Sequence, residues 1–191
     1  MSFTVVYDAC VLFPNALRDL LVRLGMTGLF RAKWSAQILD EVFRSVREKY
    51  PDAKPDRLER TRRLMTEAVR DCMVERYEDL VDTIDLHDLD DRHVVAAALR
   101  SGAQVIVTFN LKDFTPKVLA RYDIEAQHPD DFVLHVINLD PSRVARALAE
   151  QARDLRNPPM TPTELLDRLV THGLPQSMAA LRPLVVDDAD L

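Results

Sequence analysis

The sequence contains few cysteines, no long hydrophobic run and no excess of positive charge. Cys10 and Cys72 are the only cysteines among 191 residues, too few for a disulfide framework or a cysteine-based zinc site. No apolar run approaches the roughly 18 residues that a membrane-spanning helix needs, and the N-terminus lacks the basic-then-apolar pattern of a signal peptide. We therefore expect a cytoplasmic protein with no membrane partner.

The formal net charge of −6 argues against a protein that binds nucleic acid through bulk positive charge alone. The charge is, however, unevenly distributed along the chain. Residues 78–91 hold seven acids and no lysine or arginine, whereas residues 31–63 hold ten basic residues. Two interpretations stay open: two solvated faces of the protein, or an acidic metal pocket beside a basic rim that contacts phosphates.

Strand-like and helix-like segments alternate along most of the chain, which is the pattern of an α/β fold with a mostly parallel central sheet. Residues 3–7 and 105–108 are apolar and β-branched, as buried strands are, and residues 124–126 fit a short third strand. Apolar periodicity, N-cap residues and terminal glycines predict helices over residues 14–25, 36–49, 55–71 and 92–100.

The character of the sequence changes after residue 139. Helices are predicted over residues 142–155, 161–173 and 176–181, followed by an acidic tail at 187–190. The second of these helices begins with a capping box formed by Thr161 and Glu164. Because this part has too little apolar content to be stable alone, we predict a main domain over residues 1–139 and a helical extension over 140–191 that packs on it or on a partner.

Asp8 and Glu41 lie where the side chains of an α/β protein reach a ligand. Asp8 directly follows the first predicted strand, and ligands of open α/β sheets bind beyond the carboxyl ends of the strands. Glu41 lies beside the apolar face of its helix, so that it is neither in the core nor fully outward. Taken alone, a turn aspartate and a solvated glutamate are equally good interpretations.

Polar residues also precede one predicted helix and follow the second predicted strand. Asp90 and Asp91 precede the helix, where one carboxylate is explained by capping of the free N–H groups. The other carboxylate is not needed for capping, and we favour Asp91 as the residue whose side chain points into the protein. Asn110 and Asp113 follow the strand in an ordinary turn sequence, where Thr108 and Asn110 are placed to position an acid or a water.

Carboxylates that a fold brings together raise each other's pKa unless a cation neutralises them. Oxygen ligands of this kind favour Mg²⁺ or Mn²⁺, and such ions activate water for attack on phosphorus. The acids therefore predict a metal-dependent phosphodiester hydrolase. Two interpretations of His93 stay open: a group that supports the site or contacts the substrate, and an ordinary surface residue at a helix start, which is more common and which we favour. Charge alone suggests four phosphate contacts: Arg31, Lys33, Arg44 and Arg47.

Four segments together carry a likeness to a known family: Val6–Asp8, Trp34–Ser35 with Glu41, Asp90–His93 with Ala96–Ala98, and Val107–Phe114. In this order and context they resemble the PIN-domain family of ribonucleases, which includes the VapC-type toxins of bacterial toxin–antitoxin pairs. The resemblance covers residues 3 to about 135, and its most specific segment is the last of the four.

The resemblance implies a three-layer α/β/α fold and a Mg²⁺- or Mn²⁺-dependent endoribonuclease. It implies that the acids that bind the metal and carry catalysis are Asp8, Glu41, Asp91 and Asp113. Asn110 stands where many members carry an acid, which leaves the occupancy of a second metal site open. The resemblance also implies an RNA substrate, a cognate antitoxin protein and, as in many members, a homodimer.

Two other functions stay open. An aspartyl phosphatase of the haloacid-dehalogenase type also places an aspartate after its first strand. That chemistry normally uses a second acid two residues later, where this chain has Cys10. The other alternative is a catalytically degenerate PIN-fold module that docks a partner protein or RNA, with which the neutral Asn110 is compatible.

Overall fold

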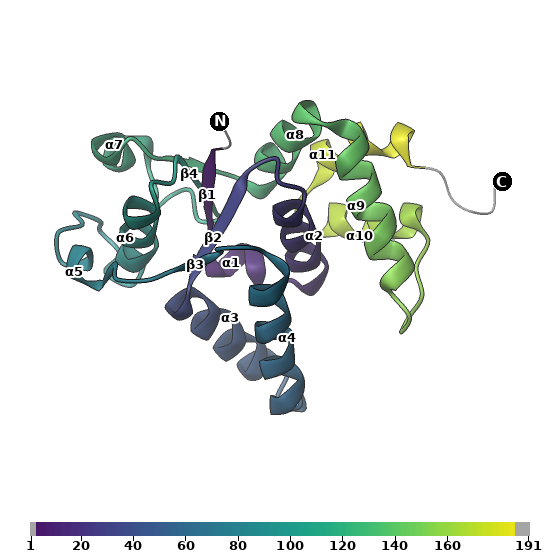
Figure 1. Ribbon diagram of the computed structural model, residues 1–191, viewed down its shortest axis with the longest axis horizontal. Helices are drawn as coiled ribbons and strands as arrows, with labels where there is room; N and C mark the ends of the chain where they lie inside the picture. Colours follow the sequence, from purple (N-terminus) through teal and green to yellow (C-terminus); the bar gives the residue numbers. More distant parts are fainter. Residues whose placement is uncertain (1–2, 186–191) are drawn as a thin grey trace.

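The computed structural model describes residues 3–185 and contains a five-stranded parallel sheet (Figure 1). The strands are β1 (Thr4–Tyr7), β2 (Arg31–Ser35), β3 (Met73–Val74), β4 (Val105–Val107) and β5 (Glu125–Gln127). Their spatial order is β3-β2-β1-β4-β5, so the strand order reverses at β1, where α/β sheets bind their ligands. The predicted acidic tail lies outside the described residues.

The central strand β1 is buried along its whole length. Val5 pairs with Ala32 of β2 on one side and with Val105 of β4 on the other. A parallel sheet is covered on both faces, which explains why β1 and β4 are continuous apolar runs. The predicted fold class, α/β with a central parallel sheet, is confirmed.

The sequence pattern does not reveal β2 and β3. In β2 the buried Ala32 and Trp34 alternate with the more exposed Arg31 and Lys33, so that no apolar run marks the strand. β3 has only two residues and pairs with β2 at the edge of the sheet. Both strands depend on tertiary pairing more than on their own composition.

Helices follow most of the strands. They are α1 (Ala9–Leu12), α2 (Asn15–Met26), α3 (Ala36–Lys49), α4 (Pro55–Ala68), α5 (Glu78–Val81), α6 (Arg92–Ser101), α7 (Pro116–Leu119), α8 (Pro129–Leu139), α9 (Pro141–Asp154), α10 (Pro162–Thr171) and α11 (Pro175–Leu181). The predicted helices are present with shifted ends, whereas α1, α5, α7 and α8 were not predicted. No helix within residues 3–185 is long and apolar enough to cross a membrane.

Helices cover both faces of the sheet, so the domain has the three layers that were predicted (Figure 1). On one side α6 packs on β1, β2 and β4. On the other side the Tyr7 hydroxyl of β1 donates to the Leu21 carbonyl of α2 at 3.1 Å. Phe132 of α8 meets the Tyr7 and Phe30 rings edge-on, at centroid distances of 6.1 and 5.1 Å. These rings fix α8 against the sheet.

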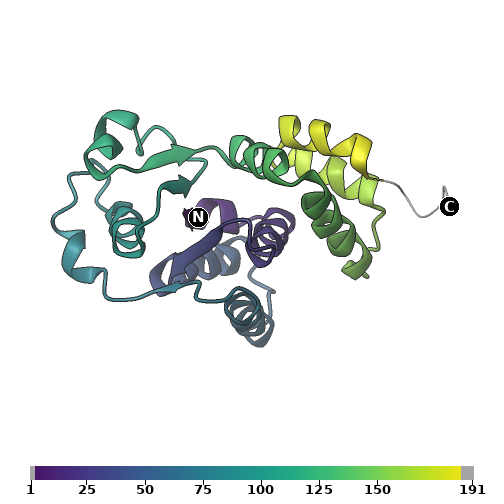
Figure 2. The same ribbon diagram turned by 45° about the horizontal axis from the view of Figure 1, so that its top comes forward.

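The helices α9, α10 and α11 lie beside α2 and α8 at one end of the molecule (Figure 2). The buried Gln151 of α9 donates from Nε2 to the Ala16 carbonyl of α2 at 2.9 Å. The Asp130 carboxylate of α8 accepts from the Ser177 hydroxyl at 2.6 Å. Residues 140–185 thus pack on α2 and α8, and the status of the extension as a separate unit stays a prediction.

Candidate active site

Asp8 lies at the carboxyl end of β1 and is held by several hydrogen bonds. Its Oδ1 accepts from the Ala9 N–H at the start of α1, at 2.6 Å. Its Oδ2 accepts from the Thr108 hydroxyl at 2.7 Å and from the Cys10 thiol at 2.9 Å. Asp8 is therefore both a helix cap and a carboxylate whose orientation is fixed by residues that follow β1 and β4. Burial, and then the Asp8 charge, raise the pKa of Cys10 to about 12, so this thiol stays protonated as a donor.

Asp91 precedes α6 and makes no capping hydrogen bond there. Its Oδ2 instead accepts from Asn110 Nδ2 at 3.0 Å, which joins α6 to the segment after β4. Burial raises the pKa of Asp91 to about 6, together with the negative charges of Asp8, Asp88 and Asp113. These carboxylates repel one another, so the site is short of positive charge.

The acids offer oxygen atoms at a spacing that suits a metal ion. One carboxylate oxygen each of Asp88, Asp91 and Asp113 lies within 4.8 Å of the others. The Asn110 Oδ1 atom is buried and has no hydrogen-bond partner among residues 3–185. Carboxylate and amide oxygens are the ligands that Mg²⁺ and Mn²⁺ prefer, and the residues present fit such an ion.

Glu41 reaches the site from α3, whose N-terminus is capped by Ser35. Its Oε1 atom lies 2.9 Å from Nε2 of His93, which is on α6. The expectation that His93 is a surface residue is wrong, because its side chain is only 3% exposed. The close contact with His93 holds Glu41 toward α6 and therefore toward Asp91.

These side chains line one cleft of about 650 Å³ between α1, α3 and the start of α6. Its walls carry the acids Asp8, Glu41, Asp90 and Asp91 together with Asn110. Asp113 belongs to the adjoining cluster with Asp88 and Asp91. All the acids predicted as site residues therefore meet at the carboxyl edge of the sheet, beside Thr108.

Only one of the four basic residues suggested by charge lines this cleft. That residue is Arg44. Arg31 and Lys33 lie on β2, where Arg31 pairs with Thr4 at the opposite end of the strands from Asp8. The Lys33 ammonium bonds to the Asp71 carbonyl, and Arg47 lines a separate pocket between α3 and α4.

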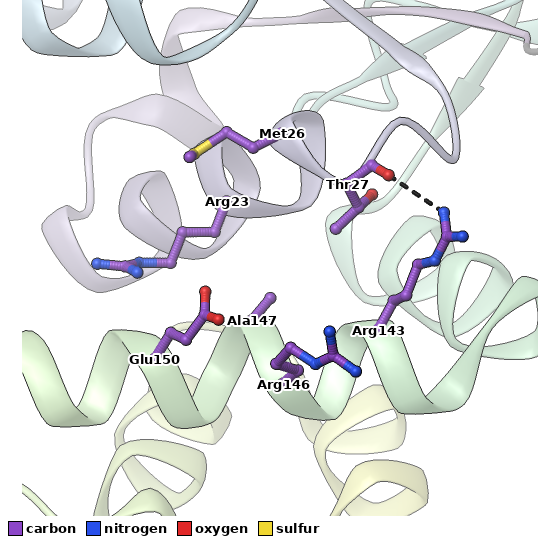
Figure 3. Close-up of a pocket in the computed structure, with 7 residues that line it drawn as sticks. All are labelled: Arg23, Met26, Thr27, Arg143, Arg146, Ala147 and Glu150. Atoms are coloured by element: carbon purple, nitrogen blue, oxygen red, sulfur yellow. Dashed lines mark hydrogen bonds between the residues drawn. The ribbon is translucent and has the colours of Figure 1, made fainter.

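A second pocket lies between α2 and α9, away from the acids (Figure 3). Its volume is about 320 Å³, half that of the acidic cleft. Its arginines are largely engaged: Arg23 pairs with Asp19 and Asp154, and Arg143 donates to the Thr27 carbonyl at 3.3 Å. The acidic cleft, with its uncompensated carboxylates, is the better candidate for an active site.

Sequence reasoning missed two residues of the site. Asp88 belongs to the cluster of three carboxylates, but it is one of seven acids in residues 78–91, and only the folded loop selects it. The thiol of Cys10 contacts Asp8, and no role in the site was predicted for this residue. The spacing of two residues after Asp8 was the one available signal for Cys10.

Comparison with known proteins is consistent with the fold. A family model described as "PIN domain" matches residues 4–112, and one described as "VapC50 C-terminal domain" matches residues 129–183. The curated protein "Putative ribonuclease VapC50" of Mycobacterium tuberculosis (strain ATCC 25618 / H37Rv) is 42% identical over 108 residues. That match covers 56% of this chain and 63% of the relative, less than two thirds of its length. No solved structure matches. Because the PIN-domain model matches more than half of the chain, this protein belongs to the PIN-domain family.

Proposed function

We propose that the protein is a Mg²⁺- or Mn²⁺-dependent endoribonuclease and the toxin of a type II toxin–antitoxin pair. The observation that carries this proposal is the meeting of Asp8, Asp91 and Asp113, from three distant segments, at the carboxyl edge of the sheet. Their mutual repulsion, felt most strongly at Asp91, is what a divalent cation would relieve. The name of the relative, which calls it a ribonuclease, supports RNA as the substrate.

We assign the metal ligands to Asp8, Asp91 and Asp113, with Glu41 beside them and with an Asp88 oxygen within 4.8 Å of those of Asp91 and Asp113. A bound Mg²⁺ or Mn²⁺ ion lowers the pKa of water and offsets negative charge at the phosphoryl group. Thr108 keeps Asp8 in one orientation, since its hydroxyl donates to that carboxylate and accepts from the Asn110 N–H at 2.9 Å.

The protein partner that we propose is a cognate antitoxin that inserts a positive side chain into the acidic cleft. A cation placed there would neutralise the same carboxylates that hold the metal, so binding would inhibit cleavage. The match to a VapC-type relative supports such a partner. A homodimer stays a prediction, which light scattering of the purified protein tests.

Cleavage of single-stranded RNA tests the proposed activity. Wild-type protein should cleave in Mg²⁺ or Mn²⁺ but not in EDTA, and Asp8→Asn should lower the rate by about 100-fold or more. Asp82→Asn is the matched control, because Asp82 is an exposed acid of the same acidic segment and does not line the cleft. Equal loss of activity in both variants would contradict the assignment.

One observation favours the alternative of a catalytically degenerate binding module. Asn110 donates to Asp91 and so takes up part of a carboxylate that a metal would use. If this alternative were correct, Mn²⁺ would neither bind the folded protein nor raise its thermal stability. If the nuclease proposal is correct, the ion must stabilise the folded state by mass action.

A further inference from the structure

The acidic cleft continues beyond the acids into a part of different chemistry. Phe13, Arg44 and Ser45 also line it, and we call the part of the cleft that these three residues line the outer end. Phe13 directly follows α1, and Ser45 lies four residues after Glu41 on α3. Four residues of α-helix span about 6 Å, so the outer end begins one helical turn away from the acids.

The outer end offers positive charge and an aromatic ring. The Arg44 side chain is exposed and has no ion pair or hydrogen bond with any residue in the described part of the chain. The Lys49 ammonium does not line the cleft but lies over the Phe13 ring, 5.2 Å from its centre. These groups match a phosphate and a base, because Arg binds phosphate through charge-assisted hydrogen bonds and bases stack on aromatic rings.

The two ends of the cleft act differently on a polyanion. The carboxylates at the inner end repel phosphate unless a cation is bound, whereas Arg44 attracts phosphate with or without metal. A strand would therefore be held first at the outer end, with its neighbouring phosphodiester delivered to the acids. An aromatic ring between two helices can stack only on a base that is not paired within a duplex.

We propose that Phe13, Arg44 and Ser45 form a subsite for one unpaired nucleotide beside the phosphodiester that is cut. In this subsite the base stacks on Phe13, Arg44 binds the phosphate of that nucleotide and the Ser45 hydroxyl donates to a sugar or phosphate oxygen. The subsite rests on the proposed ribonuclease function and adds to it the residues that bind the nucleotide beside the cut.

Equilibrium binding of a fluorescently labelled, unstructured RNA 12-mer to the full-length protein in EDTA tests the subsite. Phe13→Leu keeps the apolar bulk but removes the ring face, and it should weaken binding about 5- to 100-fold. Phe13→Tyr should restore wild-type binding. Arg44→Ala should weaken binding about tenfold. It should also reduce the slope of log Kd against log salt concentration by about one.

The controls keep the same chemistry outside the cleft. Arg47→Ala removes the same charge one turn further along α3, in a different pocket. Tyr50→Leu removes a ring that also lies near Lys49, at 5.9 Å, but does not line the cleft. Both controls should bind like wild type. Thermal unfolding of every variant identifies a loss of fold. If Phe13→Leu does not fold, RNA binding by Phe13→Tyr and Arg44→Ala decides the test.

Three results would overturn the subsite: Phe13→Leu and Arg44→Ala bind like their controls, wild-type binding is too weak to measure, or a duplex of the same sequence binds as tightly. Failure of the nuclease proposal has a different signature. In that case no divalent ion supports cleavage by wild type, while the two subsite variants still lose binding relative to their controls, and the subsite stands.

Discussion

Asp91 is the residue whose surroundings bear most directly on the site. Its carboxylate is partly withdrawn from water and lies near those of Asp8, Asp88 and Asp113, and together these effects raise its pKa to about 6. Without metal, a negative charge on Asp91 is a cost to folding. With a divalent cation bound beside it, the same negative charge would instead stabilise the folded protein.

The pH dependence of stability in EDTA follows from this shift. The folded-state pKa of Asp91 lies above its ordinary value of 3.8, so between these pH values the folded protein holds a proton that the unfolded chain has lost. The free energy of unfolding should therefore fall as pH rises from about 4 to 6, by about 1–2 kcal/mol after solvent screening. Asp91→Asn should remove this fall in urea unfolding curves measured at pH 4.5 and 7. An unchanged slope would contradict the shift.

At the scale of single residues, the candidate site was only partly predictable from the sequence. Asp8, Glu41, Asp91 and Asp113 stood out because each follows a predicted strand, lies along a predicted helix or directly precedes one. The contact between Glu41 and His93 was not predictable, because it depends on how α3 and α6 pack together.

At the scale of elements, α8 and α11 are joined by one buried carboxylate. Asp130 accepts from the Ser177 N–H and hydroxyl at 2.8 and 2.6 Å and from the Gln176 N–H at 3.0 Å. Burial alone would raise the pKa of Asp130, but the Ser177 and Gln176 donors outweigh it and lower the pKa. The contribution of Asp130 is therefore present above its ordinary pKa and lost as pH falls through the lowered one.

Removal of this carboxylate should loosen the C-terminal helices. Asp130→Ala leaves several buried donors without a partner and should reduce the free energy of unfolding by about 3 kcal/mol. The neighbouring Asp131→Ala, at an exposed position, should change it by less than about 0.5 kcal/mol. Urea unfolding measures both. Similar values for the two variants would show that Asp130 does not anchor α11.

The elements were predictable where local sequence dominates. Ser35 caps α3, and Thr161 and Glu164 form the expected capping box of α10. β2 and β3 escaped prediction because their residues become strands only through pairing with β1 and with each other. The hydrophobic α8 escaped because it directly precedes α9, separated from it only by Asp140, which blurs the boundary between the two.

At the scale of the whole molecule, alternation of strands and helices was enough to predict an α/β fold with a parallel central sheet, since parallel strands need helical connections. The three layers were predicted from the resemblance to the PIN-domain family. The net charge of −6 was less informative. This single number sums the negative charges of the acids at the sheet edge and the positive charge of Arg44 on the neighbouring helix α3. Only the fold shows that both charges line one cleft.

A divalent cation should stabilise the whole folded protein. At a free concentration 100 times its Kd, Mn²⁺ or Mg²⁺ should add about 2.7 kcal/mol to the free energy of unfolding, which raises the Tm of a chain of this size by about 5–10 °C. Differential scanning calorimetry with and without EDTA measures the shift. Asp91→Asn should lose most of it, and Asp82→Asn should keep it. A full shift in Asp91→Asn would place the ion elsewhere.

The most direct test of metal-dependent hydrolysis at these acids is identification of the RNA ends that the wild-type protein produces. Attack by water needs no 2′-hydroxyl, so we expect cleavage in Mg²⁺ or Mn²⁺ even where the nucleotide at the cut carries a 2′-hydrogen. The products should carry a phosphate monoester and a free hydroxyl, and Asp8→Asn should produce neither. A 2′,3′-cyclic phosphate end, or cleavage that persists in EDTA, would contradict the proposed chemistry.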